Sequence, residues 1–199
     1  PVSNDRDFWY QQTGPDKFAS TYIKTVGGTT WHWLGTALRL VPADFELRSR
    51  YGKGQDWPVS YAALSPFYDK AETELGVSGD SASDLGSPRN APYPMPAIRQ
   101  TYLDTSFARA LTGTAYDVRS TPQARNSQDR ADRPACCGNA SCIPVCPVQA
   151  KYDATVHVDR ATRAGAVLMT RANVVGLDVG PDNRISTIRY RRWDGTEGS

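Results

Sequence analysis

The stretch Val174-Val-Gly-Leu-Asp-Val179, with Gly180-Pro-Asp-Asn183 and Ile185-Ser-Thr-Ile-Arg-Tyr-Arg-Arg192 after it, decides the fold class. Its valines, isoleucines and tyrosine favour β-strands, and the Gly-Pro-Asp-Asn cluster favours a turn. Two runs of strand-forming residues on either side of a short turn are typical of a hairpin. The stretch therefore predicts two paired strands joined by a turn.

A helix is predicted immediately before these strands. Residues 155–164 follow a helical pattern that Gly165 closes, and Val167–Thr170 has the composition of a further short strand. A helix followed by short strands is typical of a domain that mixes both kinds of element. We therefore expect an α/β fold.

Upstream of residue 130 the sequence alternates helix signals with loop signals. Ser65 is a good N-cap and Pro66 suits the first helical position, so a helix is predicted from Ser65 to Leu75, stopped by Gly76. Further helices are predicted from the pair Gly27-Gly28 through Arg39, from Pro42-Ala-Asp44, and over Leu103–Leu111. Residues 78–100 are rich in Gly, Ser and Pro and predict a loop.

The composition is that of an ordinary folded protein. The chain has 199 residues, of which 39% are hydrophobic and 22% charged, and its net charge is +2. Neither Lys nor Arg forms a long block, so nucleic acid is not an expected partner. No stretch approaches the ~20 apolar residues that a membrane-spanning helix needs. Both ends look cut, and we expect the chain to be the middle of a longer protein.

All four cysteines lie within eleven residues, with the spacing Cys136-Cys137-x4-Cys142-x3-Cys146, and Pro147 follows the last. Thiolates are the standard ligands of iron–sulfur clusters, and the end of this run matches the Cys-x3-Cys-Pro tail of bacterial ferredoxin loops. The spacing therefore favours an iron–sulfur cluster on these four cysteines. If only three of them bind, a three-iron cluster results, and one of the adjacent pair is the spare.

Two other interpretations of the cysteines stay open on spacing alone. A disulfide between adjacent cysteines is strained, and loops this short constrain the unfolded chain little. Structural zinc sites prefer two Cys-x2–4-Cys pairs separated by a longer spacer. Here adjacent cysteines replace one such pair, and neighbouring side chains on extended backbone point in opposite directions.

Gly27-Gly28-Thr29-Thr30 combines free backbone amides with two hydroxyls at the expected start of a helix. That arrangement suits a pyrophosphate or the edge of a flavin, although a Gly-Gly turn is common without any ligand. His32, between two tryptophans, has two interpretations, a core histidine or a site residue, and the first is favoured without further context. The only other histidine is His157, so a histidine-based metal site or a Ser-His-Asp triad is not expected.

Several segments together resemble one family, the glucose–methanol–choline oxidoreductases. The family's first signature, whose glycine pair lies against FAD, resembles Val26-Gly-Gly-Thr-Thr-Trp-His-Trp33. Its later course resembles Asp56-Trp-Pro58, Ser65-Pro-Phe-Tyr68, Leu75-Gly-Val-Ser-Gly79, Pro92-Tyr-Pro-Met-Pro96, Ala124-Arg-Asn-Ser127 and the cysteine run through Pro147. The last three segments are most similar to the branch that contains bacterial membrane-bound gluconate 2-dehydrogenases and their glucose, fructose and sorbitol relatives.

The resemblance implies an activity, cofactors and partners. The family binds FAD and removes a hydride from a carbon that bears a hydroxyl group, here of a sugar, polyol or sugar acid. In the cluster-bearing branch a three-iron–four-sulfur centre accepts the flavin electrons and a multihaem cytochrome c subunit follows it, with a small accessory subunit beside them. The resemblance also implies a location on the periplasmic face of the inner membrane, with membrane association through the partner subunit.

The resemblance also assigns residues and segments. It implies that Gly27, Gly28, Thr29 and Thr30 line FAD with His32 beside the isoalloxazine ring, and that Val174 or Val175 lies in the strand that contacts the adenine. We accordingly expect residues 1–60 and 151–199 to form parts of a Rossmann-like FAD-binding domain. Residues 61–130 are expected to be cap or substrate-domain segments, and residues 131–150 a cysteine-rich cluster loop.

Two family elements find no match in this sequence. They are the Gly-x-Gly-x-x-Gly turn that holds the pyrophosphate and the catalytic histidine paired with Asn or His, so no catalytic residue is expected in this chain. Two alternatives come from other classes. A ferredoxin-like electron carrier would hold a cluster without flavin, and a zinc-stabilised binding module would hold one zinc without redox activity.

Overall fold

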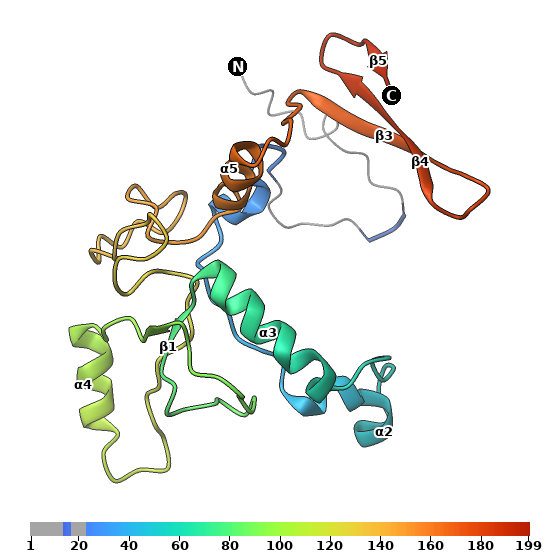
Figure 1. Ribbon diagram of the computed structural model, residues 1–199. Helices are drawn as coiled ribbons and strands as arrows, with labels where there is room; N and C mark the ends of the chain where they lie inside the picture. Colours follow the sequence, from blue (N-terminus) through green and yellow to red (C-terminus); the bar gives the residue numbers. More distant parts are fainter. Residues whose placement is uncertain (1–13, 17–22) are drawn as a thin grey trace. The chain divides into compact units, whose positions relative to one another are not determined.

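The computed structural model describes residues 14–16 and 23–199 (Figure 1). The chain divides into two compact units, Pro1–Ala154 and Thr155–Ser199. Part of the segment expected over residues 1–60, namely residues 1–13 and 17–22, lies outside the described residues. Helices and strands both occur, so the expectation of a mixed α/β composition is confirmed.

The first unit contains short elements joined by long loops. In chain order these are the 3-10 turns η1 (Gly28–Trp31) and η2 (Pro42–Glu46), helices α2 (Leu47–Tyr51) and α3 (Tyr61–Leu75), strands β1 (Ser78–Gly79) and β2 (Met95–Pro96), and helix α4 (Tyr102–Ala110). The strands β1 and β2 pair in parallel. The predicted helices from Pro42 and over Leu103–Leu111 are confirmed to within a few residues, and residues 78–100 are mostly loop, as predicted.

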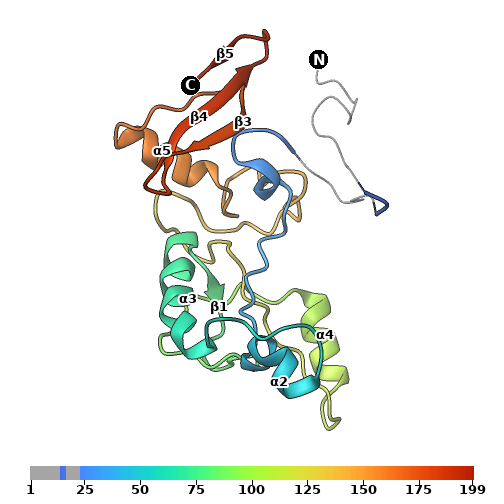
Figure 2. The same cartoon turned by 90° about the vertical axis from the view of Figure 1, so that its right-hand side faces the viewer.

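The second unit consists of helix α5 (Thr155–Arg163) and an antiparallel sheet of order β3-β4-β5. Its strands are β3 (Ala172–Val179), β4 (Ile185–Arg192) and β5 (Glu197–Gly198), and Figure 2 shows the long hairpin of β3 and β4. Hydrogen bonds Gly180 N–H to Arg184 O and Asn183 N–H to Gly180 O close its turn at 2.8 and 3.0 Å. The predicted hairpin and preceding helix are confirmed.

The predicted strand over Val167–Thr170 is wrong. These residues take part in neither of the strand pairings of the second unit, which join β3 to β4 and β4 to β5. Val167 is 92% exposed, so burial does not favour an extended conformation either. Strand-forming residues alone do not produce a strand where no neighbouring backbone pairs with them.

Helix α3 begins earlier than predicted. Its N-cap is Ser60, whose Oγ accepts a hydrogen bond from Ala63 N–H at 3.2 Å, whereas Ser65 is buried within the helix. Pro66 therefore lies inside the helix rather than at its first position. Gly76 ends the helix in the left-handed conformation, with φ 71°, as predicted.

The helix predicted from the glycine pair through Arg39 is also wrong. Only the 3-10 turn over Gly28–Trp31 forms. Gly35, at φ 88°, takes a backbone conformation outside the helical region, and the chain after it runs beside the segment 122–124. Ala37 N–H donates to Pro122 O at 3.0 Å, and Ala124 N–H donates to Gly35 O at 2.6 Å. Pairing with a distant segment thus replaces the local helix.

The segment 122–126 is the centre of the first unit. On one side Gln123 and Ser78 exchange two backbone hydrogen bonds of 2.8 and 2.9 Å. On the other side Tyr152 N–H donates to Ala124 O at 2.8 Å, and Asn126 N–H donates to Ala150 O at 2.9 Å. Ala124 and Asn126 are completely buried. Three distant parts of the chain are therefore held together through one short extended segment.

A buried ion-pair network joins helix α3 to two loops. Glu72 accepts hydrogen bonds of 2.8 Å from both Nε and Nη2 of Arg39, and of 2.9 and 2.5 Å from Nη1 and Nη2 of Arg89. Asp69 adds a second carboxylate against Arg39 at 2.5 Å. Burial by itself raises the pKa of Glu72, but the hydrogen bonds from Arg39 and Arg89 outweigh it and the pKa lies below its ordinary value.

Replacing Glu72 with glutamine is expected to destabilise the protein by about 3–5 kcal/mol, because it leaves the buried guanidinium group of Arg89 without a carboxylate and that of Arg39 with Asp69 alone. The measurement is urea-induced unfolding at neutral pH. Glu74→Gln, at an exposed position of the same helix, is the matched control and should change stability little.

The same pair of variants gives a test in acid. Because the pKa of Glu72 is lower in the folded state, its stabilisation is complete above the ordinary pKa and is lost as the pH falls through the folded value. The wild type should show this loss, and Glu72→Gln should lack it. Equal stabilities of wild type and Glu72→Gln at neutral pH would contradict the role of the network.

Candidate cofactor site

The glycine pair forms a tight turn that requires glycine. Gly27 and Gly28 have φ of 88° and 54°, in the left-handed region that side chains disfavour. Gly28 N–H donates to Thr25 O at 2.9 Å and fixes the turn. A Cβ on Gly28 would meet no atom within 4 Å, so the backbone here faces open space. The turn is partly buried, and its open side beside Gly28 leaves room for a ligand, while the flavin contact stays a prediction.

The predicted basis for anion binding at this place needs correction. The expected long helix would have supplied a positive N-terminal end, but η1 has only four residues. Thr30 Oγ1 donates to Gly27 O and accepts from Ala154 N–H at 2.9 Å, so this hydroxyl is already engaged within the protein. Thr29 is exposed. The argument for a ligand therefore rests on the open glycine backbone and not on a helix dipole.

His32 follows η1 and is partly buried, and its two neighbours in the sequence are tryptophans whose indole groups donate hydrogen bonds. Trp31 Nε1 donates to Val26 O at 2.7 Å, and Trp33 Nε1 donates to Tyr152 O at 2.8 Å. The Trp33 and Tyr152 rings also meet edge to face at 6.4 Å. Both indoles thus fix the segment around His32, and Trp33 packs against the part of the chain that follows the cysteines.

Lys151 is the residue that sequence reasoning missed in this region. It is 1% exposed, and its Nζ donates to the carbonyl oxygens of Trp31 and Trp33 at 2.6 and 2.7 Å, with Thr30 O at 3.5 Å. The pKa of Lys151 lies below its ordinary value because of burial, and the nearby Cys142, Asp153 and Cys146 offset only part of this effect. The ammonium group therefore links the glycine-pair turn to the cysteine segment.

The cysteine segment is an irregular loop anchored at both ends. Cys136 N–H donates to Asn126 O at 2.8 Å at its start, and Asn126 N–H donates to Ala150 O at its end. Residues 134–149 contain no helix or strand, as the prolines and glycine predicted. In Figure 2 this part of the chain, yellow to orange, is drawn throughout as loop.

The four thiols are free, so the disulfide interpretation finds no support. Cys137 is exposed, and the other three are partly buried. Over residues 14–16 and 23–199, no three potential ligands come together as a metal-binding group. Four free thiols are suitable donors for a cluster. Arg125, whose Nη1 donates to Cys142 Sγ, also has a buried Nε–H without a hydrogen-bond acceptor, which a ligand at this place would satisfy. The sulfurs themselves are not gathered around one point.

Val174 and Val175 lie in β3 of the second unit, as predicted. Val174 is paired with Tyr190, and Val175 forms a bulge between Val174 and Gly176. Their side chains are 62% and 52% exposed. The strand is therefore confirmed, and the adenine contact stays a prediction.

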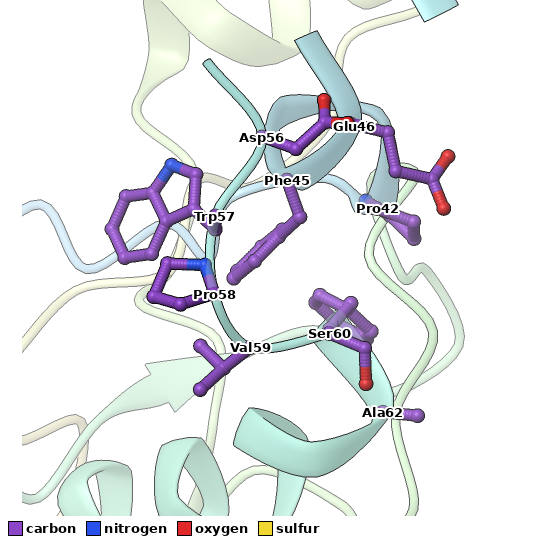
Figure 3. Close-up of a pocket in the computed structure, with 10 residues that line it drawn as sticks. Pro42, Phe45, Glu46, Asp56, Trp57, Pro58, Val59, Ser60 and Ala62 are labelled. Atoms are coloured by element: carbon purple, nitrogen blue, oxygen red, sulfur yellow. The ribbon is translucent and has the colours of Figure 1, made fainter. Parts of the chain in front are cut away.

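A separate hollow of about 550 Å³ lies where η2 meets the start of α3 (Figure 3). Its lining is Pro42, Phe45, Glu46, Asp56, Trp57, Pro58, Val59, Ser60, Tyr61 and Ala62. The rings of Phe45 and Trp57 are 5.1 Å apart. The carboxylates have protein partners: Asp56 accepts from Arg48 and Ser49 N–H, and Glu46 pairs with Arg50. The hollow thus lies beside a structural turn and carries no argument for a site.

The comparisons with known proteins agree with the motifs. The chain is 39% identical over 181 residues to "Fructose dehydrogenase large subunit" of Gluconobacter japonicus, which covers 89% of this chain and 33% of that protein. It is 30% identical to "Gluconate 2-dehydrogenase flavoprotein" of Pantoea cypripedii, over 86% of this chain and 33% of the relative. It is also 30% identical to "2-methyl-1,2-propanediol dehydrogenase" of Mycolicibacterium austroafricanum, over 83% of this chain and 30% of the relative.

The chain is homologous to part of the glucose–methanol–choline oxidoreductases. It spans about a third of the length of these curated relatives. No protein-family model matches it. Within the part of the chain that the structure describes, no helix is long and apolar enough to cross a membrane.

The hydrogen bonds of the buried Lys151 give a testable prediction about stability. Replacing Lys151 with methionine removes the donor from the partly buried carbonyl groups of Trp31 and Trp33 and is expected to destabilise the protein by roughly 1–3 kcal/mol. Urea unfolding measures the change. Lys53→Met, at an exposed position, is the control and should remain within error of the wild type. A Lys151→Met protein as stable as this control would contradict a stabilising role of the hydrogen bonds from Lys151 to Trp31 O and Trp33 O.

Proposed function

We propose that this chain is part of an FAD-dependent oxidoreductase that oxidises an alcohol group of a sugar, polyol or sugar acid. The observation that carries the proposal is the 39% identity to a fructose dehydrogenase large subunit over 89% of the chain. A second relative is named a flavoprotein and acts on gluconate, and a third is named for a diol. Sugars, sugar acids and diols share the alcohol group as the reacting function.

The glycine-pair turn is the proposed flavin contact in this chain. FAD, when bound, supplies an acceptor for a hydride from the alcohol carbon. Gly27 and Gly28 offer backbone without Cβ atoms, and the space beside Gly28 is open. Lys151 holds the carbonyls of Trp31 and Trp33 and so fixes the segment that carries His32. Val174 and Val175 are the proposed adenine contacts of the second unit.

We further propose that Cys136, Cys137, Cys142 and Cys146 supply the ligands of an iron–sulfur cluster, of the three-iron–four-sulfur type if three of them bind. Such a cluster, when bound, supplies a one-electron relay between a two-electron flavin and a one-electron acceptor. Four free thiols on a loop anchored at both ends support this proposal. Gathering the sulfurs requires movement of the loop between its anchors, which its lack of regular structure permits.

The partners follow from the same proposal. A one-electron acceptor suits a multihaem cytochrome c subunit, with a small accessory subunit in the same complex. The words "large subunit" in the name of the fructose dehydrogenase relative support an assembly of several chains. We propose, from the family resemblance alone, that this assembly lies on the periplasmic face of the inner membrane.

The composition of the purified protein tests the cofactors. Full-length protein purified under anaerobic conditions is expected to contain both flavin and iron and to be brown-yellow. Elemental analysis, an absorption spectrum and acid release of the flavin measure this. Zinc in place of iron would refute the cluster, and absence of flavin would refute the FAD-dependent function.

A cysteine variant tests the relay separately. In full-length Cys142→Ser, loss of a thiolate ligand should abolish cytochrome c reduction but leave sugar-dependent bleaching of the flavin intact. Stopped-flow spectroscopy at the flavin and haem bands follows both reactions. Ser141→Ala, next to the same cysteine, is the control and should retain both. Normal cytochrome reduction by Cys142→Ser would contradict the relay.

A further inference from the structure

We propose that residues 151–154 preorganise the glycine-pair turn for FAD, with Lys151 as the positioning residue. The inference rests on the FAD-dependent function proposed above, and it assigns a role to a segment outside the glycine motif. Its basis is a buried ammonium group at the end of the turn, two further hydrogen bonds between the same segments, and a difference in packing along the turn.

The turn begins with two adjacent glycines and therefore needs support from outside itself. Gly27 and Gly28 both lie in the left-handed region, with φ of 88° and 54°. Glycine has more conformational freedom to lose than any other residue, and η1, which begins at Gly28, has only four residues. A ligand that binds such a turn must supply the free energy of ordering it, unless the protein has already fixed the turn.

Lys151 fixes the end of this turn. Its ammonium group is buried and donates to the carbonyl oxygens of Trp31 and Trp33 at 2.6 and 2.7 Å. Trp31 is the last residue of η1, and the last carbonyl groups of a helical turn lack partners within it. A cation at that end binds these carbonyl groups and interacts favourably with their dipoles. Lys151 thus caps the turn from 120 residues away in the sequence.

Two further hydrogen bonds join the same two segments. Trp33 Nε1 donates to Tyr152 O at 2.8 Å. Ala154 N–H donates to Thr30 Oγ1 at 2.9 Å, and this hydroxyl donates in turn to Gly27 O. One side chain therefore connects the segment after the cysteine loop directly to the glycine pair, and the turn is held at several points along its length.

The two ends of the segment 27–35 differ in packing. At Gly35 an added Cβ would lie 3.4 Å from Lys151 Cγ and 3.5 Å from Ala124 O, so this end is closely packed. At Gly28 an added Cβ would meet no atom within 4 Å. The segment is therefore anchored at Gly35 and open at Gly28. A fixed backbone without side chains at its open end suits the close approach of a ligand.

Residues 151–154 have a base that is independent of the turn. Tyr152 N–H donates to Ala124 O at 2.8 Å, and Asn126 N–H donates to Ala150 O at 2.9 Å, where the cysteine loop ends. Ala124 and Asn126 are completely buried. The core of the first unit thus sets the position of this segment, and movement of the cysteine loop between its anchors would leave the segment in place.

The test measures the Kd of FAD for full-length protein from which flavin has been removed. Lys151→Met removes the donor to both carbonyl groups, so the fraction of turns in the binding conformation falls and the Kd rises by the same factor. We expect a rise of about tenfold. Trp33→Phe keeps an aromatic ring but loses one hydrogen bond, and a rise of roughly threefold is expected. Titration with FAD, followed by flavin fluorescence, measures both.

Two controls separate positioning from stability. Phe45→Ala should lose at least as much stability as Lys151→Met, because it leaves a cavity in the buried aromatic cluster, but its Kd should equal that of the wild type. Trp57→Phe removes an indole elsewhere in the fold and should also leave the Kd unchanged. Circular dichroism verifies folding. If Lys151→Met does not fold, Trp33→Phe decides, and an unchanged Kd in that variant overturns the inference.

The remaining outcomes separate this inference from the proposed function. Wild-type protein that binds no FAD refutes the FAD-dependent function and the inference together. FAD binding by the wild type with an unchanged Kd in Lys151→Met overturns the inference alone. Equal rises in Lys151→Met and Phe45→Ala also overturn it, because the effect would then follow from lost stability and not from the turn.

Discussion

The buried ammonium group of Lys151 is the constraint on which the candidate site depends. An unpaired charge in a protein interior is costly, so surrounding groups must converge on it. Here the converging groups are carbonyl oxygens of Thr30, Trp31 and Trp33, and the lysine itself follows the cysteine loop directly. The glycine-pair turn and the end of the cysteine loop thus share one fixed point, although about 120 residues separate them in the sequence.

Local signals were sufficient for elements that depend on local interactions. The hairpin of β3 and β4 follows from strand-forming runs around Gly180-Pro-Asp-Asn183, and α4 follows from its own pattern. The failures arose where distant pairing decides. Residues after Gly35 pair with the segment 122–124 and so form no helix. Helix α3 has Ser60 rather than Ser65 as its N-cap and accommodates Pro66 inside it. Such tertiary preferences leave no periodic trace in the sequence.

The candidate site divides in the same way. The glycine pair and the four cysteines could be predicted as candidate site residues because their chemistry is unusual and each set lies close together in the sequence. Arg125, which is partly buried, and Lys151, which is buried, were missed because charged residues are usually exposed. Only the backbone pairing between residues 124–126 and 150–152 brings both cations to the base of the loop. A weak signal was available: Arg125 lies within the motif Ala124-Arg-Asn-Ser127, and Lys151 follows the cysteine run by four residues.

The first unit contains two groups of cations, one beside helix α3 and one at the base of the cysteine loop, and the groups that face them differ. Arg39 and Arg89 face the carboxylates of Glu72 and Asp69, which balance them within the protein. Such a network needs no ligand, and its natural role is to join α3 to its loops. Around Cys142 the groups that act on Arg125 and Lys151 include the sulfurs of Cys142 and Cys146 as well as Asp153. The cations at the cysteine loop therefore lie beside sulfurs and one carboxylate, whereas the cations beside α3 are balanced by carboxylates alone.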